Sequence, residues 1–187
     1  MKTGLIIVDM INDYLHPKGL LFCKKCRDII PVVSNTLDFA RKNDIRIFFV
    51  NTTLENKDDL LAKRWGLHAV KNSFGAEVIK ELIPQKNEII IPKKTYNGFF
   101  NTTLNYELTK HGIKNIAIAG IHTHVCVLFT ATEGFELGYN VTVLEDCITT
   151  DNESMHKKRL PFFDTHIGKL SSSDKWKKEI ISFNQLM

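Results

Sequence analysis

The sequence predicts an α/β fold, a three-layer α/β/α sandwich with a central, mostly parallel sheet of about six strands. Short apolar runs rich in β-branched residues alternate with amphipathic helical patterns along the whole chain. The apolar runs are nearly continuous, as expected for strands that are buried on both faces. With 187 residues and no repeat or linker, the chain is expected to form a single Rossmann-like domain over residues 1–187.

The elements follow one another in regular order. Strands are expected over 4–10, 45–51, 88–92, 115–120 and 139–146, with 166–170 as the candidate for a short sixth. Helical patterns cover roughly 27–43, 74–83, 100–111, 126–138, 151–160 and 173–184. Gly112 and Gly138 stand where helix C-caps favour glycine. The stretch 51–73 is the longest irregular region, and its length favours a functional role.

Composition narrows the classes of function. The formal net charge is +4, but the lysines are spread along the chain, which favours solvated faces over a nucleic-acid site. No apolar run approaches the roughly 20 residues of a membrane span. The apolar run at the N-terminus stops at Asp9, too early for a signal peptide. We therefore expect a cytoplasmic protein that binds neither nucleic acid nor membrane.

Two of the four cysteines, Cys23 and Cys26, have C-x-x-C spacing. A zinc site of the usual kind needs two more ligands at a suitable spacing, and the sequence holds no second C-x-x-C pair. The pair follows a Pro-Lys-Gly loop, whereas a thioredoxin-type motif stands where a strand leads into a helix. We expect two reduced cysteines near the start of a helix.

Residues that follow the predicted strands are the main functional candidates, because ligands of an open parallel sheet bind outside the carboxyl ends of its strands. These residues are Asp9, Asn51, Thr52, Lys93, Lys94 and the stretch GIHTHVCVLF at 120–129, which contains Cys126. An acid, a base and a thiol should therefore meet at one edge of the sheet.

The stretch GIHTHVCVLF holds His122, His124 and Cys126 at alternate positions, which suits a metal site, a cysteine nucleophile or a buried strand end. The run after Cys126 is an amphipathic helix, so its sulfur would lie in the first turn. There the free N–H groups and partial positive charge lower a thiol pKa. Asp9 could take the thiol proton and Lys93 could hold both groups. A small buried hydrophobe at a strand–helix junction is equally consistent with the spacing alone.

Three segments resemble the isochorismatase-like cysteine hydrolase superfamily, which includes nicotinamidases. LIIVDMINDY resembles its apolar strand ending in Asp, and KKTYNGFFNTTL resembles its K-x-x-Y-S-A-F-x-x-T-x-L segment. AIAGIHTHVCVLFTATEGFELGYNVTVLEDC resembles its G-x-x-T-x-x-C-V-x-x-T-A stretch and the strand that follows. The three segments stand in the family's order and cover nearly the whole length of the chain.

The resemblance implies a catalytic triad of Asp9, Lys93 and Cys126. Lys94 competes with Lys93, but Lys93 lies six residues before Phe99, as the family motif requires. An amidohydrolase reaction follows from this triad: the Cys126 thiolate attacks the amide of a small molecule, and water then hydrolyses the thioester, with Asp9 moving the protons.

The resemblance also implies a cis peptide bond between Ile121 and His122. That bond would direct the His122 N–H into the site, where it would form the oxyanion hole with the Cys126 N–H. On this interpretation, the alternating histidines and cysteine do not act together as metal ligands.

Nicotinamidases resembling this chain hold a metal with an Asp-x-His after the second strand and a later histidine. The later histidine is matched by His68, but Thr52 and Leu54 stand where the other two ligands belong. We therefore expect no cofactor, and a divalent metal such as zinc is disfavoured. Nicotinamide is then disfavoured as the substrate, because its ring nitrogen would have no metal to bind.

Five residues are expected to line a pocket for a small, flat or compact amide. They are Tyr14, Trp65, His68, Phe99 and His124, although Phe99 is equally consistent with a core position. Family membership implies a homo-oligomer, a dimer or a tetramer. The alternative functions are a metal-dependent nicotinamidase and a degenerate, non-catalytic member of the family. A further alternative is an isochorismatase, but family members with that activity generally lack a cysteine at the nucleophile position.

Overall fold

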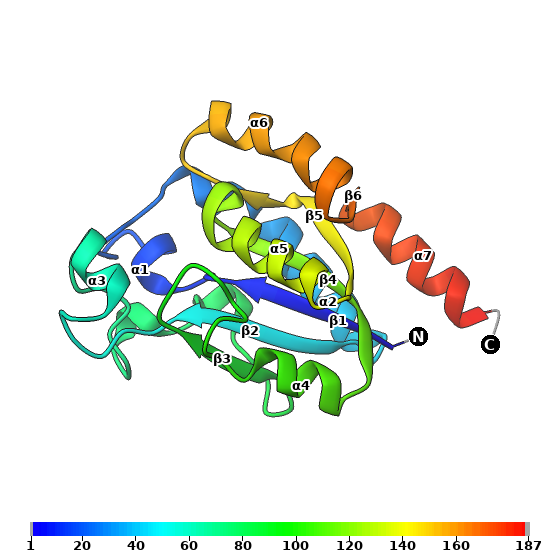
Figure 1. Cartoon of the computed structure of the whole chain (residues 1–187), viewed down its shortest axis with the longest axis horizontal. Helices are drawn as coiled ribbons and strands as arrows, with labels where there is room; N and C mark the ends of the chain where they lie inside the picture. The colour runs from blue at the N-terminus through cyan, green and yellow to red at the C-terminus, as the bar shows by residue number, and fades with distance from the viewer. Residues whose placement is uncertain (1, 186–187) are drawn as a thin grey trace.

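The computed structural model describes residues 2–185, which form the predicted three-layer sandwich (Figure 1). Its central sheet is parallel throughout and has six strands in the order β3-β2-β1-β4-β5-β6. The strands are β1 (Lys2–Val8), β2 (Arg46–Thr52), β3 (Ile89–Lys93), β4 (Ile113–Ile121), β5 (Asn140–Thr149) and β6 (Lys169–Ser171). All five predicted strands are confirmed. The candidate sixth is confirmed only in its second half, because residues 166–167 belong to a π-helical turn and β6 begins at Lys169.

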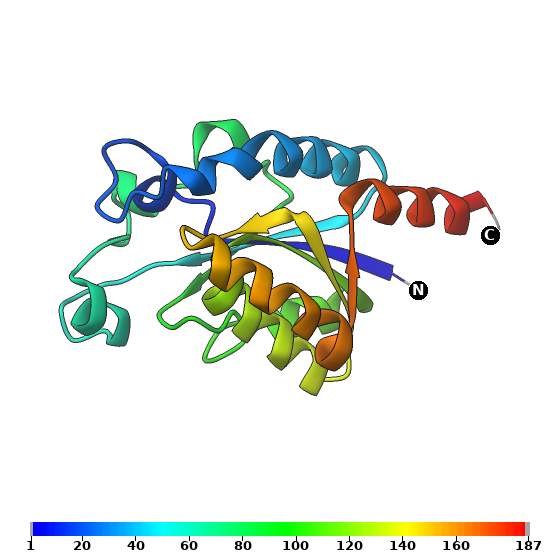
Figure 2. The same ribbon diagram turned by 90° about the horizontal axis from the view of Figure 1, so that it is seen from above.

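Helices cover both faces of the sheet, as Figure 2 shows from above. One face carries α2 (Ile30–Lys42) and α7 (Ser173–Gln185), and the other carries α4 (Leu104–Lys110), α5 (Leu128–Glu136) and α6 (Glu153–Phe162). Each face therefore has its own apolar core, one centred on Leu37 and Phe49 and the other on Val127 and Ile118. No helix within residues 2–185 has both the length and the apolar character of a membrane span.

One predicted helix, over 74–83, is wrong. The segment forms two short 3₁₀ turns, Phe74–Ala76 and Lys80–Leu82, with extended backbone between them. That extended backbone pairs with the loop after β1: Asn12 N–H donates to Glu77 O at 2.9 Å, and Ile79 N–H donates to Met10 O at 3.0 Å. Hydrogen bonds to a distant segment thus override the local helical pattern.

The loops beyond the carboxyl ends of β1 and β2 contain two short helices that the sequence pattern does not predict. They are α1 (Asn12–Leu15) and α3 (Leu60–Trp65), which lie at the left of Figure 1. Helix α3 falls inside the stretch 51–73, for which the pattern predicts irregular structure. The two helices add side chains to the edge of the sheet where the candidate residues lie.

The strand order reverses at β1, whose neighbours β2 and β4 lead to opposite ends of the sheet. At such a switch point the connections leave in opposite directions and open a crevice, where ligands bind in folds of this kind. The last residue of β1, Val8, is in register with Gly120 of β4. Asp9 and the turn after β4 therefore emerge next to each other.

Gly120 allows this close approach of β4 to β1. Its φ of 118° lies in the region that side chains disfavour, and a Cβ there would lie 2.1 Å from the Val8 carbonyl oxygen. Because this oxygen belongs to the backbone of a central strand, it cannot move aside without disturbing the sheet.

Gly120→Ala should destabilise the protein by about 3 kcal/mol through this collision. Gly138→Ala is the matched control: Gly138 also has a positive φ, of 82°, but apart from Gly138 itself and its two chain neighbours no heavy atom of residues 2–185 lies within 4 Å of the point that a Cβ would occupy. Its substitution should cost about 1 kcal/mol. Urea unfolding of both variants measures the difference, and equal losses would contradict the close-approach argument.

Candidate active site

Lys93 and Asp9 form a buried ion pair at the carboxyl edge of the sheet. Lys93 ends β3, Asp9 follows β1, and the Lys93 Nζ donates to Asp9 Oδ2 at 2.8 Å. The Lys93 side chain is fully buried and that of Asp9 is 1% exposed. Thr52 ends the intervening strand β2; its N–H donates to Asp9 Oδ1 at 2.6 Å and its hydroxyl accepts from Lys93 Nζ at 2.8 Å. Three neighbouring strand ends thus satisfy both charges.

Lys93 stays cationic in this environment. Burial alone would lower the pKa of Lys93, but the negative charge of Asp9 and its hydrogen bond to Nζ act against burial, and the pKa of Lys93 is raised. A third hydrogen bond, from Nζ to the Thr95 carbonyl oxygen at 3.1 Å, uses the remaining ammonium proton.

The Cys126 sulfur completes the group, at 3.6 Å from Lys93 Nζ. Cys126 is 6% exposed and belongs to a π-helical turn, Thr123–Val127, that leads into α5. The structure therefore brings together the predicted acid, base and thiol, which come from positions 9, 93 and 126 of the chain.

The expectation that the helix start lowers the thiol pKa is wrong for the free protein. Burial raises the pKa of Cys126 most, the Asp9 carboxylate raises it further, and Lys93 only partly opposes them. Because burial and a nearby anion both disfavour a thiolate, Cys126 is a neutral thiol at neutral pH.

The turn that carries Cys126 begins with the expected cis peptide bond between Ile121 and His122. The His122 carbonyl oxygen accepts hydrogen bonds from the N–H groups of Val125, at 3.0 Å, and Val127, at 3.2 Å. These two bonds flank Cys126 on both sides and fix the backbone on which its sulfur is carried. Burial lowers the pKa of His122, so its imidazole is neutral at neutral pH.

Tyr14 and His68, two of the predicted pocket residues, are hydrogen-bonded to each other at 2.9 Å between the tyrosine oxygen and Nε2. The His68 Nδ1 lies 2.7 Å from the Gly66 carbonyl oxygen. That oxygen can only accept, so in the neutral ring Nδ1 carries the proton and Nε2 accepts from Tyr14. Burial, with the negative charge of Asp9, raises the pKa of Tyr14 well above its usual value. Tyr14 therefore remains a hydroxyl donor.

The other predicted pocket residues are less closely tied to the trio. Trp65 is 53% exposed on α3 and donates to the Tyr96 hydroxyl at 2.7 Å. Phe99 is buried in the apolar core and stacks on Tyr139 with ring centres 5.9 Å apart. The buried Nδ1 of His124 has no hydrogen-bond partner among residues 2–185.

Lys94, the competing lysine, lies apart from Asp9 and Cys126. It is exposed and forms surface ion pairs with Glu55, at 2.5 Å, and Asp59, at 3.3 Å. The one-residue difference in register places its side chain on the opposite side of the strand from Lys93.

Two residues that hold the site together are absent from the predicted catalytic and pocket residues. Thr52 directly follows a predicted strand, and this position is the sequence feature that could have identified it as a site residue. Asp13 is 5% exposed, and its carboxylate accepts hydrogen bonds from the N–H groups of Leu20, at 3.1 Å, and Ala69, at 2.6 Å. Asp13 thereby connects the segments that carry Tyr14 and His68. The Asn-Asp pair after β1 is the sequence feature that could have identified it.

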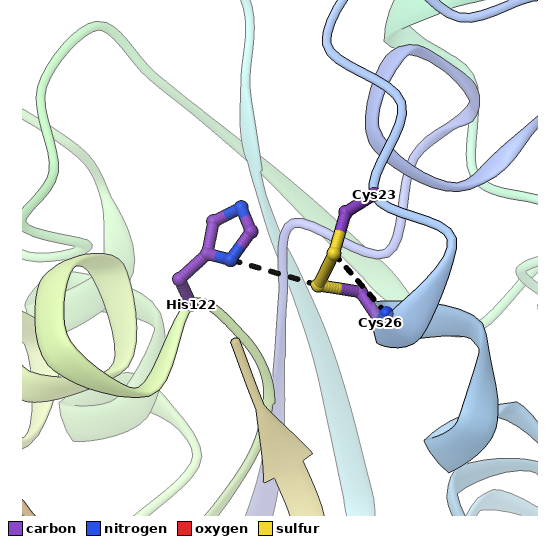
Figure 3. A group of neighbouring side chains, drawn as sticks. All are labelled: Cys23, Cys26 and His122. Carbon is purple, nitrogen blue, oxygen red and sulfur yellow. Dashed lines mark hydrogen bonds between the residues drawn. A yellow bond between two sulfur atoms is a disulfide. The ribbon is translucent and has the colours of Figure 1, made fainter. Parts of the chain in front are cut away.

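The Cys23–Cys26 pair differs from expectation. The two sulfur atoms form a disulfide, not two reduced thiols, and Figure 3 shows them beside the imidazole of His122. The pair lies close to the turn that carries Cys126, so C-x-x-C spacing here places two sulfur atoms near the candidate site.

The donor set of the resembling nicotinamidases does not fit a metal here. The Thr52 hydroxyl is bonded to Lys93, Leu54 belongs to a small apolar cluster, and both ring nitrogens of His68 have protein partners. These three side chains therefore offer no set of free ligand atoms.

Known proteins share this fold. The sequence profile of the isochorismatase domain matches residues 3–175. An isochorismatase-like hydrolase from Alkaliphilus metalliredigens is 30% identical, with a TM-score of 0.90 over 96% of this chain and 99% of that one. N-carbamoylsarcosine amidase from Thermoplasma acidophilum is 27% identical, with a TM-score of 0.84 over 93% and 98% of the two chains. Pyrazinamidase of Pyrococcus horikoshii, solved in complex with zinc, is 26% identical, with a TM-score of 0.83 over 92% and 99%.

Lys93→Met should destabilise the protein by about 3 kcal/mol, because it leaves the Asp9 carboxylate buried without its cation. Lys94→Met removes a lysine one residue away whose ion pairs are exposed, and should cost less than about 1 kcal/mol. Urea unfolding compares the two.

The double variant Asp9→Asn with Lys93→Met removes both charges and should recover part of the lost stability. A Lys93→Met variant as stable as Lys94→Met would show that the buried ion pair does not form.

Proposed function

The chain belongs to the isochorismatase family, and we propose that it is a cysteine amidohydrolase that cleaves a C–N bond of a small molecule. The observation that carries this proposal is the position of the Lys93 ammonium, 2.8 Å from the Asp9 carboxylate and 3.6 Å from the Cys126 sulfur. In this proposal Cys126 is the nucleophile, Asp9 the general base and acid, and Lys93 the cation that holds the two together.

Charge balance favours proton transfer from Cys126 to Asp9 when substrate binds. In the resting site a neutral thiol lies beside a carboxylate, whose charge raises the pKa of the thiol. Moving the proton gives a thiolate beside a neutral carboxylic acid. Lys93 contacts both groups, so one anion faces its ammonium before and after the transfer. The raised pKa thus keeps Cys126 as an unreactive thiol in the resting site, and it does not prevent the thiolate from forming and attacking the substrate.

The thiolate attacks the carbonyl carbon, and the carbonyl oxygen becomes an oxyanion. We assign the backbone N–H groups of His122 and Cys126 as its donors, since the turn that carries them is fixed by hydrogen bonds on both sides of Cys126. Asp9 then returns the proton to the leaving nitrogen, which departs as ammonia or an amine and leaves a thioester. Water that has lost a proton to Asp9 attacks the thioester, releasing the acid and restoring the thiol.

The substrate is a small amide or carbamoyl compound with polar groups. The Tyr14 hydroxyl donates its proton to His68, so its oxygen can accept a hydrogen bond from substrate. The Nδ1 of His124, which has no partner among residues 2–185, offers a ring nitrogen in the turn of Cys126. N-carbamoylsarcosine amidase, one of the similar structures, is named for a C–N substrate of this size class. The test panel should therefore include N-carbamoyl amino acids and short aliphatic amides.

A metal-dependent nicotinamidase is the competing function, and no specific observation favours it. Thr52 and Leu54 replace the ligands that the resembling enzymes use, and the nitrogens of His68 are engaged. We propose that catalysis uses side chains and backbone alone.

Cys126→Ala should abolish ammonia release from the best substrate of the panel, by more than about 10³-fold in kcat, because no nucleophile remains. Cys147→Ala is the matched control, since Cys147 is a second buried free cysteine that lies in the other core. Coupled ammonia detection measures both. Activity that survives Cys126→Ala would refute the mechanism, and equal loss in both variants would point to unfolding.

Treatment with EDTA should leave this activity within about twofold of the untreated enzyme, because Cys126, Asp9 and the backbone N–H groups carry out every proposed step. Nicotinamide is assayed in parallel, with and without added Zn²⁺. Hydrolysis of nicotinamide that appears only with Zn²⁺ would favour the competing function.

A further inference from the structure

The side chains of Cys23, Cys26 and His122 form a cluster that the proposed mechanism does not use, since it involves only the backbone of His122. One ligand atom of each residue lies within 4.8 Å of the others, and both cysteines are buried. Figure 3 shows that the cluster joins two segments far apart in sequence, the loop before α2 and the turn after β4. Thiolate sulfur and imidazole nitrogen are the ligands that zinc prefers.

We propose that the reduced form of this cluster binds a thiophilic divalent cation of the zinc class through Cys23 Sγ, Cys26 Sγ and His122 Nδ1. The site is separate from the catalytic trio, because Asp9, Lys93 and Cys126 provide none of its ligands. It also shares no ligand with the positions that the resembling nicotinamidases use.

The spacing of the ligand atoms suits a tetrahedral ion. Bonds of about 2.3 Å to sulfur and about 2.0 Å to nitrogen place a sulfur and a nitrogen ligand roughly 3.6 Å apart. The Cys26 sulfur lies 3.6 Å from His122 Nδ1. The imidazole is therefore already at ligand distance from one sulfur. Binding the ion would require the second sulfur to turn toward it and Nδ1 to give up its contact with the Thr150 hydroxyl, at 3.3 Å.

The backbone holds the two cysteines as a chelating loop. The Cys26 N–H donates to the Cys23 sulfur at 3.1 Å, a contact that stabilises negative charge on that sulfur. The Cys23 N–H donates to the Tyr14 carbonyl oxygen at 2.8 Å, which anchors the loop to α1. The loop and the imidazole thus favour binding of a cation between them.

Cation binding requires reduction, because the structure contains the disulfide. A trialkylphosphine can serve as the reductant with one molecule of water. The phosphine is oxidised to its oxide, the sulfur–sulfur bond breaks, and each sulfur receives one proton from the water. When the cation binds, the two thiols release these protons to the buffer and the imidazole binds as the neutral ring.

The probe is Co²⁺ added alone to phosphine-reduced, desalted protein, because cobalt bound to thiolate gives a charge-transfer absorption band. We expect saturation at one equivalent of Co²⁺ and loss of the band when Zn²⁺ displaces it. The oxidised protein should give no band.

Three variants test the assignment of the ligands. Cys23→Ser and Cys26→Ser should abolish the band, and His122→Ala should weaken Co²⁺ affinity at least about tenfold. Cys147→Ser is the matched control with one buried cysteine removed elsewhere, and it should bind as the unmodified protein does. Circular dichroism of each variant confirms that it is folded.

The proposal is overturned if the reduced protein gives no band, if the band survives Cys23→Ser, or if His122→Ala leaves the affinity unchanged. A disulfide that serves only as a cross-link would give the first of these results. Cys126→Ala should keep the full band, so a failure of the proposed amidohydrolase mechanism and a failure of this site remain distinguishable.

Discussion

The buried ion pair of Lys93 and Asp9 is the constraint on which the rest of the site depends. Removing two charges from water costs several kcal/mol per ion unless close partners satisfy them. Here the partners are the two charges themselves, both polar groups of Thr52 and the Thr95 carbonyl oxygen. These atoms coincide only if β1, β2 and β3 are adjacent and in register. The order of the strands and the chemistry of the site are therefore fixed by the same set of contacts.

This dependence explains which parts of the site could be predicted from the sequence. Asp9, Lys93 and Cys126 follow continuous apolar strands, and parallel strands present their carboxyl ends to one edge, so their meeting follows from local pattern and general topology. The segment 74–83 depends on which distant backbone lies alongside, and local pattern carries no such information. The disulfide joins two cysteines that are three residues apart, and their spacing alone does not decide whether they are oxidised. What was missed is therefore one contact between loops and one oxidation state.

The thiol pKa of Cys126 shows how tertiary burial can reverse a local effect. A helix start favours the thiolate only through a partial positive charge. Cys126 is almost fully buried and faces the full negative charge of Asp9, and both of these effects raise its pKa. The larger effects oppose the thiolate and decide the resting state. Cys126 becomes reactive when Asp9 takes up a proton, because a neutral Asp9 no longer disfavours the thiolate. Asp9 therefore controls Cys126 both as a proton acceptor and through its charge.

His122 connects the two proposed sites, and charge decides how strongly they interact. Its carbonyl oxygen fixes the turn of Cys126, its N–H is assigned to the oxyanion, and its Nδ1 lies beside Cys26. The disulfide, the dithiol and the complex of two thiolates with a divalent cation all carry no net charge. The net charge near the Lys93 and Asp9 pair is therefore the same in each state of the cluster, and long-range electrostatic coupling between the two sites is small. Any coupling must pass through the position of the His122 ring and its backbone, and it must be reciprocal between cation and substrate binding.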